Sequence, residues 1–151
     1  SAVRDFKGLP HRLELVGEFE GIRFYDDAIS TTPESTIAAL RAVPHVATVL
    51  LGGYDRGYDF SELEKEIHAR GVKHIVLFPE SGTRMFADRT GLNILQTRDM
   101  REAVKFAYAH TPAGSAALLS CASPSYGLWK NFEEKGTEFQ SAVKTMQGGG
   151  A

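Results

Sequence analysis

Three short runs rich in apolar residues constrain the fold of this chain more than any other feature. They cover residues 46–51, 74–78 and 116–120, and stretches with helical periodicity or turn-forming residues separate them. A continuous run of this kind is typical of a strand that is buried on both faces, as in a parallel sheet. The alternation of such strands with helices predicts an α/β fold in which helices cover both faces of the sheet.

The segment before these runs predicts a β-hairpin. Residues 12–20 and 22–26 alternate apolar and polar side chains on either side of Gly21, as two antiparallel strands do. A weaker strand is expected at 93–95. We therefore expect a three-layer, Rossmann-like α/β sandwich, built on a mostly parallel sheet with an N-terminal β-hairpin.

Capping residues predict where the helices begin. Thr32 precedes Pro33, which is favoured at the first helical position. Ser61 and Glu64 have the spacing of a capping box. We expect helices after Thr32, from Ser61 as far as Gly71, over 81–88, after Asp99 and over 128–146, with Trp129, Phe132 and Phe139 as core residues of the last one.

Composition narrows the classes of function. The chain has 17 Lys and Arg against 19 Asp and Glu, a net charge of −2, so it has no basic excess for a nucleic acid. No apolar stretch approaches the roughly 20 residues that span a bilayer. The single cysteine, Cys121, cannot form an internal disulfide, which suits a reducing compartment. We expect a cytoplasmic protein with neither a nucleic acid nor a membrane as partner.

Ligands of such sheets bind at the carboxyl ends of the strands, in loops 26–32, 52–60, 79–83 and 121–127. Loop 52–60 contains several glycines and Arg56, whose guanidinium suits a carboxylate or a phosphate. A glycine-rich turn with a solvated arginine explains this loop about equally well. It matches neither a dinucleotide fingerprint nor a P-loop.

The loop at 121–127 superficially resembles the nucleophile elbow of a hydrolase. That fold requires a histidine after the serine, and His110 is the last histidine of the chain, so we reject this interpretation. Two alternatives remain: a helix entry whose free N–H groups hold an anion, or Ser125 as an ordinary helix cap.

The titratable residues predict no catalytic group and no metal site in this chain. Asp26 and Asp27 lie at the end of an expected strand, where they could bind a sugar hydroxyl or a metal, or belong to a turn. Adjacent side chains in a strand point to opposite faces, so the two carboxylates are not expected to form an acid–base pair. The 5 histidines show no ligand spacing, and there is 1 cysteine, which together argue against zinc.

Four motifs, taken in order, closely resemble the C-terminal domain of the Mur ligase family. They are FKGLPHR at 6–12, FYDDAISTT at 24–32, LLGGYDRGYDF at 50–60, and 118–136, which ends in KNFEEKG. The resemblance extends from about residue 5 to about residue 145 and is strongest with the branch that adds D-glutamate to UDP-N-acetylmuramoyl-L-alanine.

The resemblance implies one domain of a three-domain, ATP-dependent, amide-bond-forming ligase of peptidoglycan biosynthesis. An N-terminal domain would bind the UDP-sugar, and a central P-loop domain would bind ATP and magnesium. The C-terminal domain would bring in glutamate, whose amine attacks an acyl phosphate. The isolated domain, residues 5–146, would then be inactive without the other two. We expect residues 1–4 to be a linker or an addition, and residues 147–151 to be a flexible tail.

The resemblance also implies roles for particular residues. Thr31, Arg56, Ser125 and Phe132 match positions that hold the glutamate carboxylates, the last two partly through backbone N–H groups. Asp27 matches an aspartate that approaches the ribose of the nucleotide. Two positions depart from the family pattern: Arg56 replaces a lysine, and Ile29 replaces a lysine near the nucleotide phosphates, which puts that phosphate contact in question.

Three other functions stay open. Arg56 and the stretch 123–126 also resemble a subgroup that adds L-glutamate, so the enantiomer is undecided. A ligase similar to folylpolyglutamate synthase is disfavoured by the LPHR and KNFEE motifs. The third alternative, from a different class, is a non-catalytic Rossmann-like module that binds a nucleotide or an anion.

Overall fold

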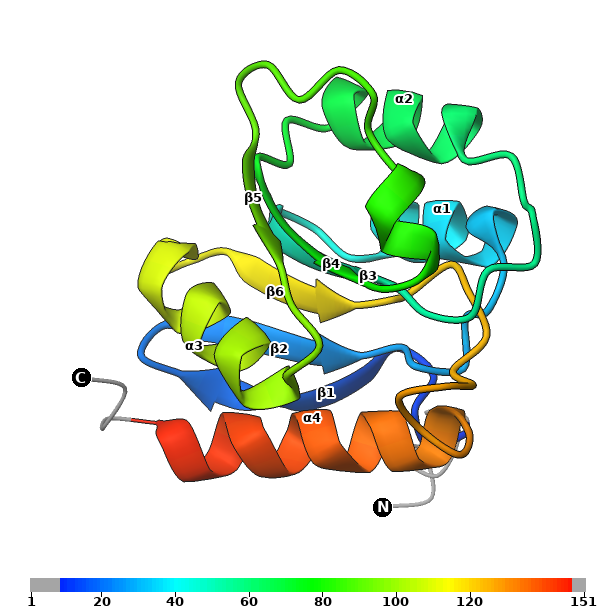
Figure 1. Ribbon diagram of the computed structural model, residues 1–151. Coiled ribbons are helices and arrows are strands. Elements are labelled where there is room, and N and C mark those ends of the chain that lie inside the picture. Colours follow the sequence, from blue (N-terminus) through cyan, green and yellow to red (C-terminus); the bar gives the residue numbers. More distant parts are fainter. Residues whose placement is uncertain (1–8, 148–151) are drawn as a thin grey trace.

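The computed structural model describes residues 9–147, which form a single six-stranded sheet with helices on both faces (Figure 1). The strand order is β1-β2-β6-β3-β4-β5. Only the β1–β2 pair is antiparallel, so the predicted sandwich and its hairpin are confirmed. The strands are β1 (Glu14–Phe19), β2 (Ile22–Asp26), β3 (Val46–Gly52), β4 (His74–Phe78), β5 (Asn93–Gln96) and β6 (Ala116–Leu119).

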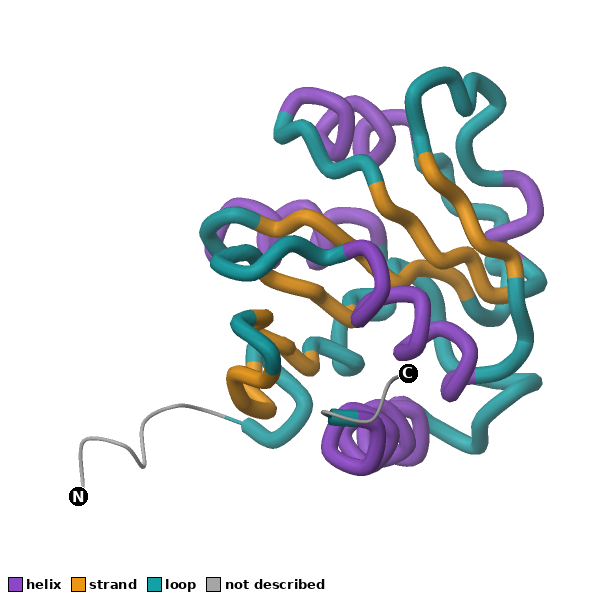
Figure 2. Tube along the Cα trace, turned by 90° about the vertical axis from the view of Figure 1, so that its left-hand side faces the viewer, coloured by secondary structure: helices purple, strands orange, loops and turns teal. Residues whose placement is uncertain are grey.

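The helices form the two outer layers. They are α1 (Pro33–Ala42), α2 (Ser61–Ala69), the short 3-10 helix η2 (Ser81–Arg84), α3 (Met100–His110) and α4 (Phe132–Met146). Helices α1 and α2 cover one face of the sheet, and α3 and α4 cover the other. Figure 2 shows the same layers from the side, with α4 viewed along its axis. No helix of the described part is long and apolar enough to cross a membrane.

The apolar run in β3 is continuous because the strand lies between two cores. Leu50 packs with α3 and α4, whereas Val49 and Leu51 pack with α1 and α2. All three side chains are 0% exposed. Successive strand residues point to opposite faces, so both sets of side chains are buried and favour apolar residues. The exception in β3 is the buried Thr48, whose hydroxyl is hydrogen-bonded to that of Thr111 at 2.7 Å.

Two predicted helix starts agree with the structure. Thr32 caps α1, and its Oγ1 accepts a hydrogen bond from the backbone N–H of Ser35 at 3.2 Å. Asp99 caps α3 and accepts from the N–H of Arg101 at 2.9 Å. Each cap satisfies a backbone donor that has no partner inside its helix.

The predicted capping box at Ser61 and Glu64 is wrong. Ser61 is already the first residue of α2, and Phe60 occupies the N-cap position without a side-chain hydrogen bond. The carboxylate of Asp59 accepts from the N–H of Ser61 at 2.9 Å instead. Glu64 accepts from the N–H of Phe86 at 2.9 Å, so a tertiary contact replaces the local one.

The last helix begins later than predicted. Helix α4 starts at Phe132, capped by Asn131, whose side chain accepts from the N–H of Glu134 at 2.8 Å. Trp129 therefore precedes the helix, although it is buried against Phe78 with ring centroids 5.2 Å apart. The short helix expected over 81–88 is limited to η2. The expectations for residues 1–8 and 148–151 lie outside the described residues.

Candidate functional site

Three of the loops singled out in the sequence meet at one edge of the sheet. They follow β2, β6 and β3, which are neighbours in the sheet, so their carboxyl ends lie together. Backbone hydrogen bonds join two of these loops: Gly52 N donates to the carbonyl of Cys121 at 2.9 Å, and Tyr54 N donates to that of Pro124 at 2.7 Å. The loops therefore form one continuous surface.

A pocket of about 340 Å³ lies between these loops and the start of α4. The four residues predicted to bind glutamate, namely Thr31, Arg56, Ser125 and Phe132, all line it. The other lining residues are Tyr58, Pro124, Tyr126 and Asn131. The structure thus brings together residues from three segments that are far apart in the sequence.

Ser125 contributes a buried hydroxyl that is not used within the described residues. The residue is 3% exposed, and its Oγ has no hydrogen-bond partner among residues 9–147. Most buried hydroxyls in proteins are paired, because leaving one unpaired costs free energy. Ser125 does not cap α4, since Asn131 does. A polar ligand in the pocket would supply the missing partner.

Arg56 contributes a free cation. Its side chain forms no hydrogen bond or ion pair with any residue of the described part, and its guanidinium carbon lies 5.8 Å from the centre of the Tyr54 ring. The neighbouring carboxylate of Asp55 is occupied by Arg84, through two hydrogen bonds of 2.7 Å each. The hydrogen bonds from Arg84 lower the pKa of Asp55 to about 2.

The start of α4 adds backbone donors. Phe132 is the first residue of the helix, and the first N–H groups of a helix have no partner inside it. They also carry the positive end of the helix dipole, which favours an anion. Together with Arg56 and Ser125, the pocket has the chemistry to bind a carboxylate.

Asp27, the predicted ribose contact, does not line this pocket. It is 2% exposed, and its Oδ2 accepts hydrogen bonds from the hydroxyls of Ser30 at 2.6 Å and Ser120 at 2.7 Å. Its Oδ1 accepts from the N–H of Leu13 at 3.1 Å. Burial raises the pKa of this carboxyl despite these hydrogen bonds. Both oxygens are engaged inside the chain, so the ribose contact stays a prediction.

A cluster of His11, Glu14 and Asp26 escaped the sequence analysis. Their ligand atoms lie within 4.8 Å of one another, close enough to share a metal ion. His11 Nδ1 is 2.6 Å from Asp26 Oδ2, however, and Gln140 Nε2 donates to the same oxygen at 2.8 Å. Glu14 and Asp26 are paired across β1 and β2, and His11 lies in the turn that precedes β1, a proximity that their spacing in the sequence does not reveal. The available signal in the sequence was that His11 and Asp26 both belong to the family motifs, at 6–12 and 24–32.

This cluster supports the pocket from behind. The imidazole of His11 meets the ring of Phe132 edge-on, with centroids 6.2 Å apart. Gly136 allows α4 to approach His11 closely, because a Cβ at position 136 would lie 2.2 Å from His11 Nδ1. The cluster therefore helps to fix the position of the first turn of α4.

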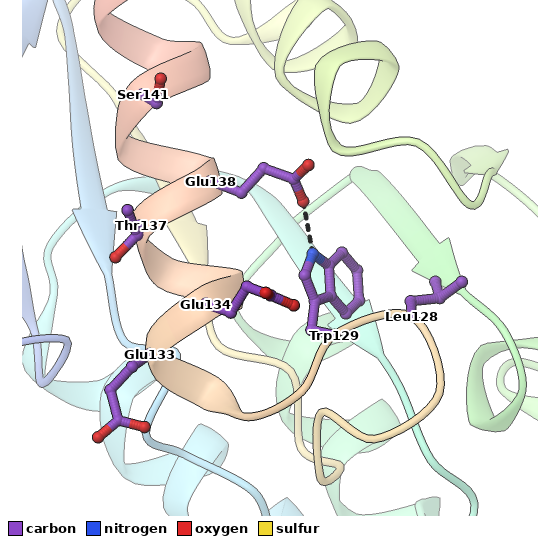
Figure 3. Close-up of a pocket in the computed structure, with 7 residues that line it drawn as sticks. All are labelled: Leu128, Trp129, Glu133, Glu134, Thr137, Glu138 and Ser141. Atoms are coloured by element: carbon purple, nitrogen blue, oxygen red, sulfur yellow. Dashed lines mark hydrogen bonds between the residues drawn. The ribbon is translucent and has the colours of Figure 1, made fainter.

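A second pocket, of about 700 Å³, is lined by residues of α4 and of the loop that precedes it (Figure 3). Trp129 donates from its indole Nε1 to Glu138 across this pocket. Glu133 and Glu134 also line it, so it presents several carboxylates and would repel an anionic ligand. None of the predicted site residues lies there.

Comparisons with known proteins agree with this architecture. The family described as Mur ligase, glutamate ligase domain, matches residues 11–123. The UDP-N-acetylmuramoylalanine–D-glutamate ligase of Caldanaerobacter subterraneus subsp. tengcongensis is 34% identical over 97% of the chain. The UDP-N-acetylmuramoyl-L-alanine–L-glutamate ligase of Salinispora tropica is 39% identical over 97% of the chain.

A solved structure shares the fold. The MurF ligase of Thermotoga maritima in complex with ADP superposes with a TM-score of 0.56 and 18% sequence identity, and the match covers 93% of this chain and 33% of that one. The chain spans 34% of the length of each of the two relatives above. On these matches, and on the motifs and sheet described above, the chain belongs to the Mur ligase family and corresponds to its glutamate ligase domain.

Proposed function

We propose that this chain is the C-terminal, amino-acid-binding domain of an ATP-dependent ligase that joins glutamate to UDP-N-acetylmuramoyl-L-alanine in peptidoglycan biosynthesis. The domain would comprise residues 5–146. The observation that carries the proposal is the pocket in which Arg56 and the buried hydroxyl of Ser125 both lack partners among the described residues. The names of both relatives described above support glutamate as the amino acid.

Glutamate fits the chemistry of the pocket. The guanidinium of Arg56 would bind one carboxylate through two parallel hydrogen bonds, which arginine does better than lysine. The hydroxyls of Ser125 and Thr31, with the backbone N–H of Phe132, would bind the other carboxylate. The amine is then the remaining polar group, left to face the activated acyl group.

In this proposal the chain contributes positioning. An amine held against an acyl phosphate reacts far faster than a free one, because the entropy of bringing the partners together has already been lost on binding. ATP and magnesium would be bound mainly by a central domain, and the UDP-sugar by an N-terminal domain. Asp27, with both oxygens engaged, and the apolar Ile29 do not fit a direct contact with nucleotide phosphates or magnesium, so we assign no step to them.

The proposed protein acts in the cytoplasm, without a nucleic acid or a membrane as partner. The net charge of −2 supports the first of these absences. The names of the relatives described above suggest a UDP-linked muramoyl substrate for the complete enzyme.

Glutamate-dependent release of ADP by the full-length enzyme tests the proposal. We expect a mass-spectrometric product of UDP-N-acetylmuramoyl-L-alanine plus one glutamate, and we expect Arg56→Ala to raise the KM for glutamate about 10- to 100-fold, the range for a hydrogen-bonded charge. The matched control is Arg101→Ala, an exposed arginine on α3. Assays with D- and L-glutamate in parallel identify the enantiomer.

The isolated chain provides the complementary test. An NMR titration should show weak binding of one glutamate enantiomer, with shifts near Thr31, Arg56 and Ser125, and no hydrolysis of ATP. Tight binding of a nucleotide by this chain alone, with no response to glutamate, would instead support a non-catalytic binding module. Turnover by the isolated chain would contradict the proposal that ATP and the UDP-sugar are bound by other domains.

A further inference from the structure

Lys135, in the first turn of α4, is a fully buried lysine. It is 0% exposed, whereas lysine is almost never fully buried unless it is paired. No carboxylate of residues 9–147 forms an ion pair with it. Its Nζ donates to the carbonyl of Gly52 at 3.1 Å and lies 4.7 Å from the centre of the Trp129 ring. The thiol of Cys121 is a further near neighbour.

The ammonium of Lys135 lies where the two pocket loops touch. Gly52 ends β3 and begins the loop that carries Arg56. A Cβ on Gly53 would lie 2.3 Å from the carbonyl oxygen of Pro124 and 3.3 Å from Lys135 Nζ, so both atoms lie close to the same point. Pro124 itself lines the pocket. Lys135 therefore lies behind the pocket wall without being part of its lining.

A buried cation without a counter-ion is unfavourable in the free protein. Transfer of an ammonium out of water costs several kcal/mol, and a carbonyl and an aromatic face compensate only part of this cost. In a medium of lower dielectric constant the field of the charge also extends further than it does in water. An anion bound in the pocket would supply the missing negative charge.

We infer that Lys135 is a positioning residue of the amino-acid site, an inference that rests on the function proposed above. Its hydrogen bond to Gly52 fixes the start of the Arg56 loop against α4. Its charge favours a ligand with two carboxylates over a ligand with one. Lys135 acts through the loops and through space, since it does not touch the substrate.

Steady-state kinetics of the full-length ligase test this inference. Lys135→Met keeps the length of the side chain and removes its charge. We expect the KM for glutamate to rise about tenfold, as for the loss of one unit charge at intermediate dielectric constant. The KM values for ATP and the UDP-sugar should stay within about twofold, and kcat within about threefold. Lys135→Arg, which retains the charge, should recover most of the loss.

Two comparisons separate an electrostatic role from a structural one. Lys144→Met removes an exposed lysine from the same helix and should leave every parameter unchanged. Glutamine, which lacks the second carboxylate, should compete with glutamate equally weakly in wild type and in Lys135→Met. A variant that loses affinity for glutamate, glutamine and ATP to the same extent would show that Lys135 only maintains the fold, and would overturn the inference.

A measurement on the unaltered protein covers the case in which Lys135→Met does not fold. With 13Cε-labelled lysine, the Lys135 signal should move as glutamate saturates the full-length enzyme, and that of Lys144 should not. A Lys135 signal that stays fixed at saturation would overturn the inference. The failure of wild type to form a glutamate-containing product would overturn the proposed function itself, which is a different result.

Discussion

The guanidinium of Arg84 holds the carboxylate of Asp55 through two hydrogen bonds of 2.7 Å, from Nε to Oδ2 and from Nη2 to Oδ1. Arg84 Nη2 also donates to the carbonyl of Tyr58 at 2.8 Å. Asp55 immediately precedes Arg56, so its ion pair with Arg84 occupies the neighbouring carboxylate in the sequence, which could otherwise neutralise the pocket cation. The free guanidinium of Arg56 therefore depends on an arginine from η2.

The first prediction concerns this pair. Arg84→Ala should release Asp55 to compete for Arg56, and the KM for glutamate should rise about three- to tenfold. Stability should change by less than about 1 kcal/mol, because partly exposed ion pairs contribute little. The double variant Arg84→Ala/Asp55→Asn should recover the wild-type KM, since the competing charge is gone. A double variant no better than Arg84→Ala would refute this account.

The second prediction is that one substitution weakens glutamate binding without lowering the stability of the fold. Ser125→Ala removes a buried hydroxyl that has no partner among residues 9–147. The free energy of unfolding should stay constant or rise by about 1 kcal/mol, because an unsatisfied polar group is lost. Affinity for glutamate should fall about fivefold or more. Thermal unfolding of the chain and the KM of the full-length enzyme provide the measurements. A marked fall in stability would mean that the hydroxyl has a partner inside the protein.

The fold was predictable from the sequence because the burial of each strand is reflected in the pattern of apolar residues within that strand. The apolar runs at 46–51 and 74–78 indicate that both faces of β3 and β4 are covered. Ligands of such sheets bind at the carboxyl ends of the strands, and this generalisation then identified the loops of the pocket. The order of the strands depends on pairings between distant segments, which periodicity does not encode. The capping box at Ser61 failed for the same reason, since Glu64 bonds to Phe86.

The same distinction between local and long-range information separates the site residues that the sequence identified from the one that it missed. Thr31, Arg56 and Ser125 lie in loops that the strand pattern identifies, whereas only the motifs identified Phe132. Lys135 escaped because its function depends on Gly52, which is 83 positions away. A lysine in a helix is normally expected to face solvent. The burial of Lys135 becomes evident only when the loop that begins at Gly52 is placed against the helix.

The third prediction concerns the support behind Phe132. Gly136→Ala would place a Cβ 2.2 Å from His11 Nδ1 and 2.7 Å from Asp26 Oδ2. The imidazole must move, and we expect a loss of about 1–3 kcal/mol in stability, as for other overpacked sites. Thr137→Ala, at the next and exposed position of α4, is the control and should change stability by less than about 0.5 kcal/mol. Equal stabilities of the two variants in urea unfolding would contradict the close packing at Gly136.

The last prediction is a pH dependence set by Asp27. Burial raises the pKa of this carboxyl above its ordinary value of 3.8, so the folded protein binds the proton more tightly than the unfolded chain does. By linkage, the contribution of Asp27 to stability is fully present below the unfolded pKa and is lost as the pH rises through the folded pKa. Asp55, whose pKa is lowered to about 2, acts in the opposite direction and below that range.

Urea unfolding of the chain at a series of pH values from about 4 upward tests this dependence. In Asp27→Asn the side chain no longer titrates, so the unfolding free energy of wild type minus that of the variant should fall as the pH rises through the folded pKa of Asp27. Asp88→Asn removes an exposed aspartate whose pKa is lowered by its hydrogen bonds to Thr90. For this variant the same difference should rise slightly just above pH 4 and then stay constant, the opposite direction from Asp27→Asn. A constant difference for Asp27→Asn as well would mean that the hydrogen bonds from Ser30, Ser120 and Leu13 fully offset the burial of the carboxylate.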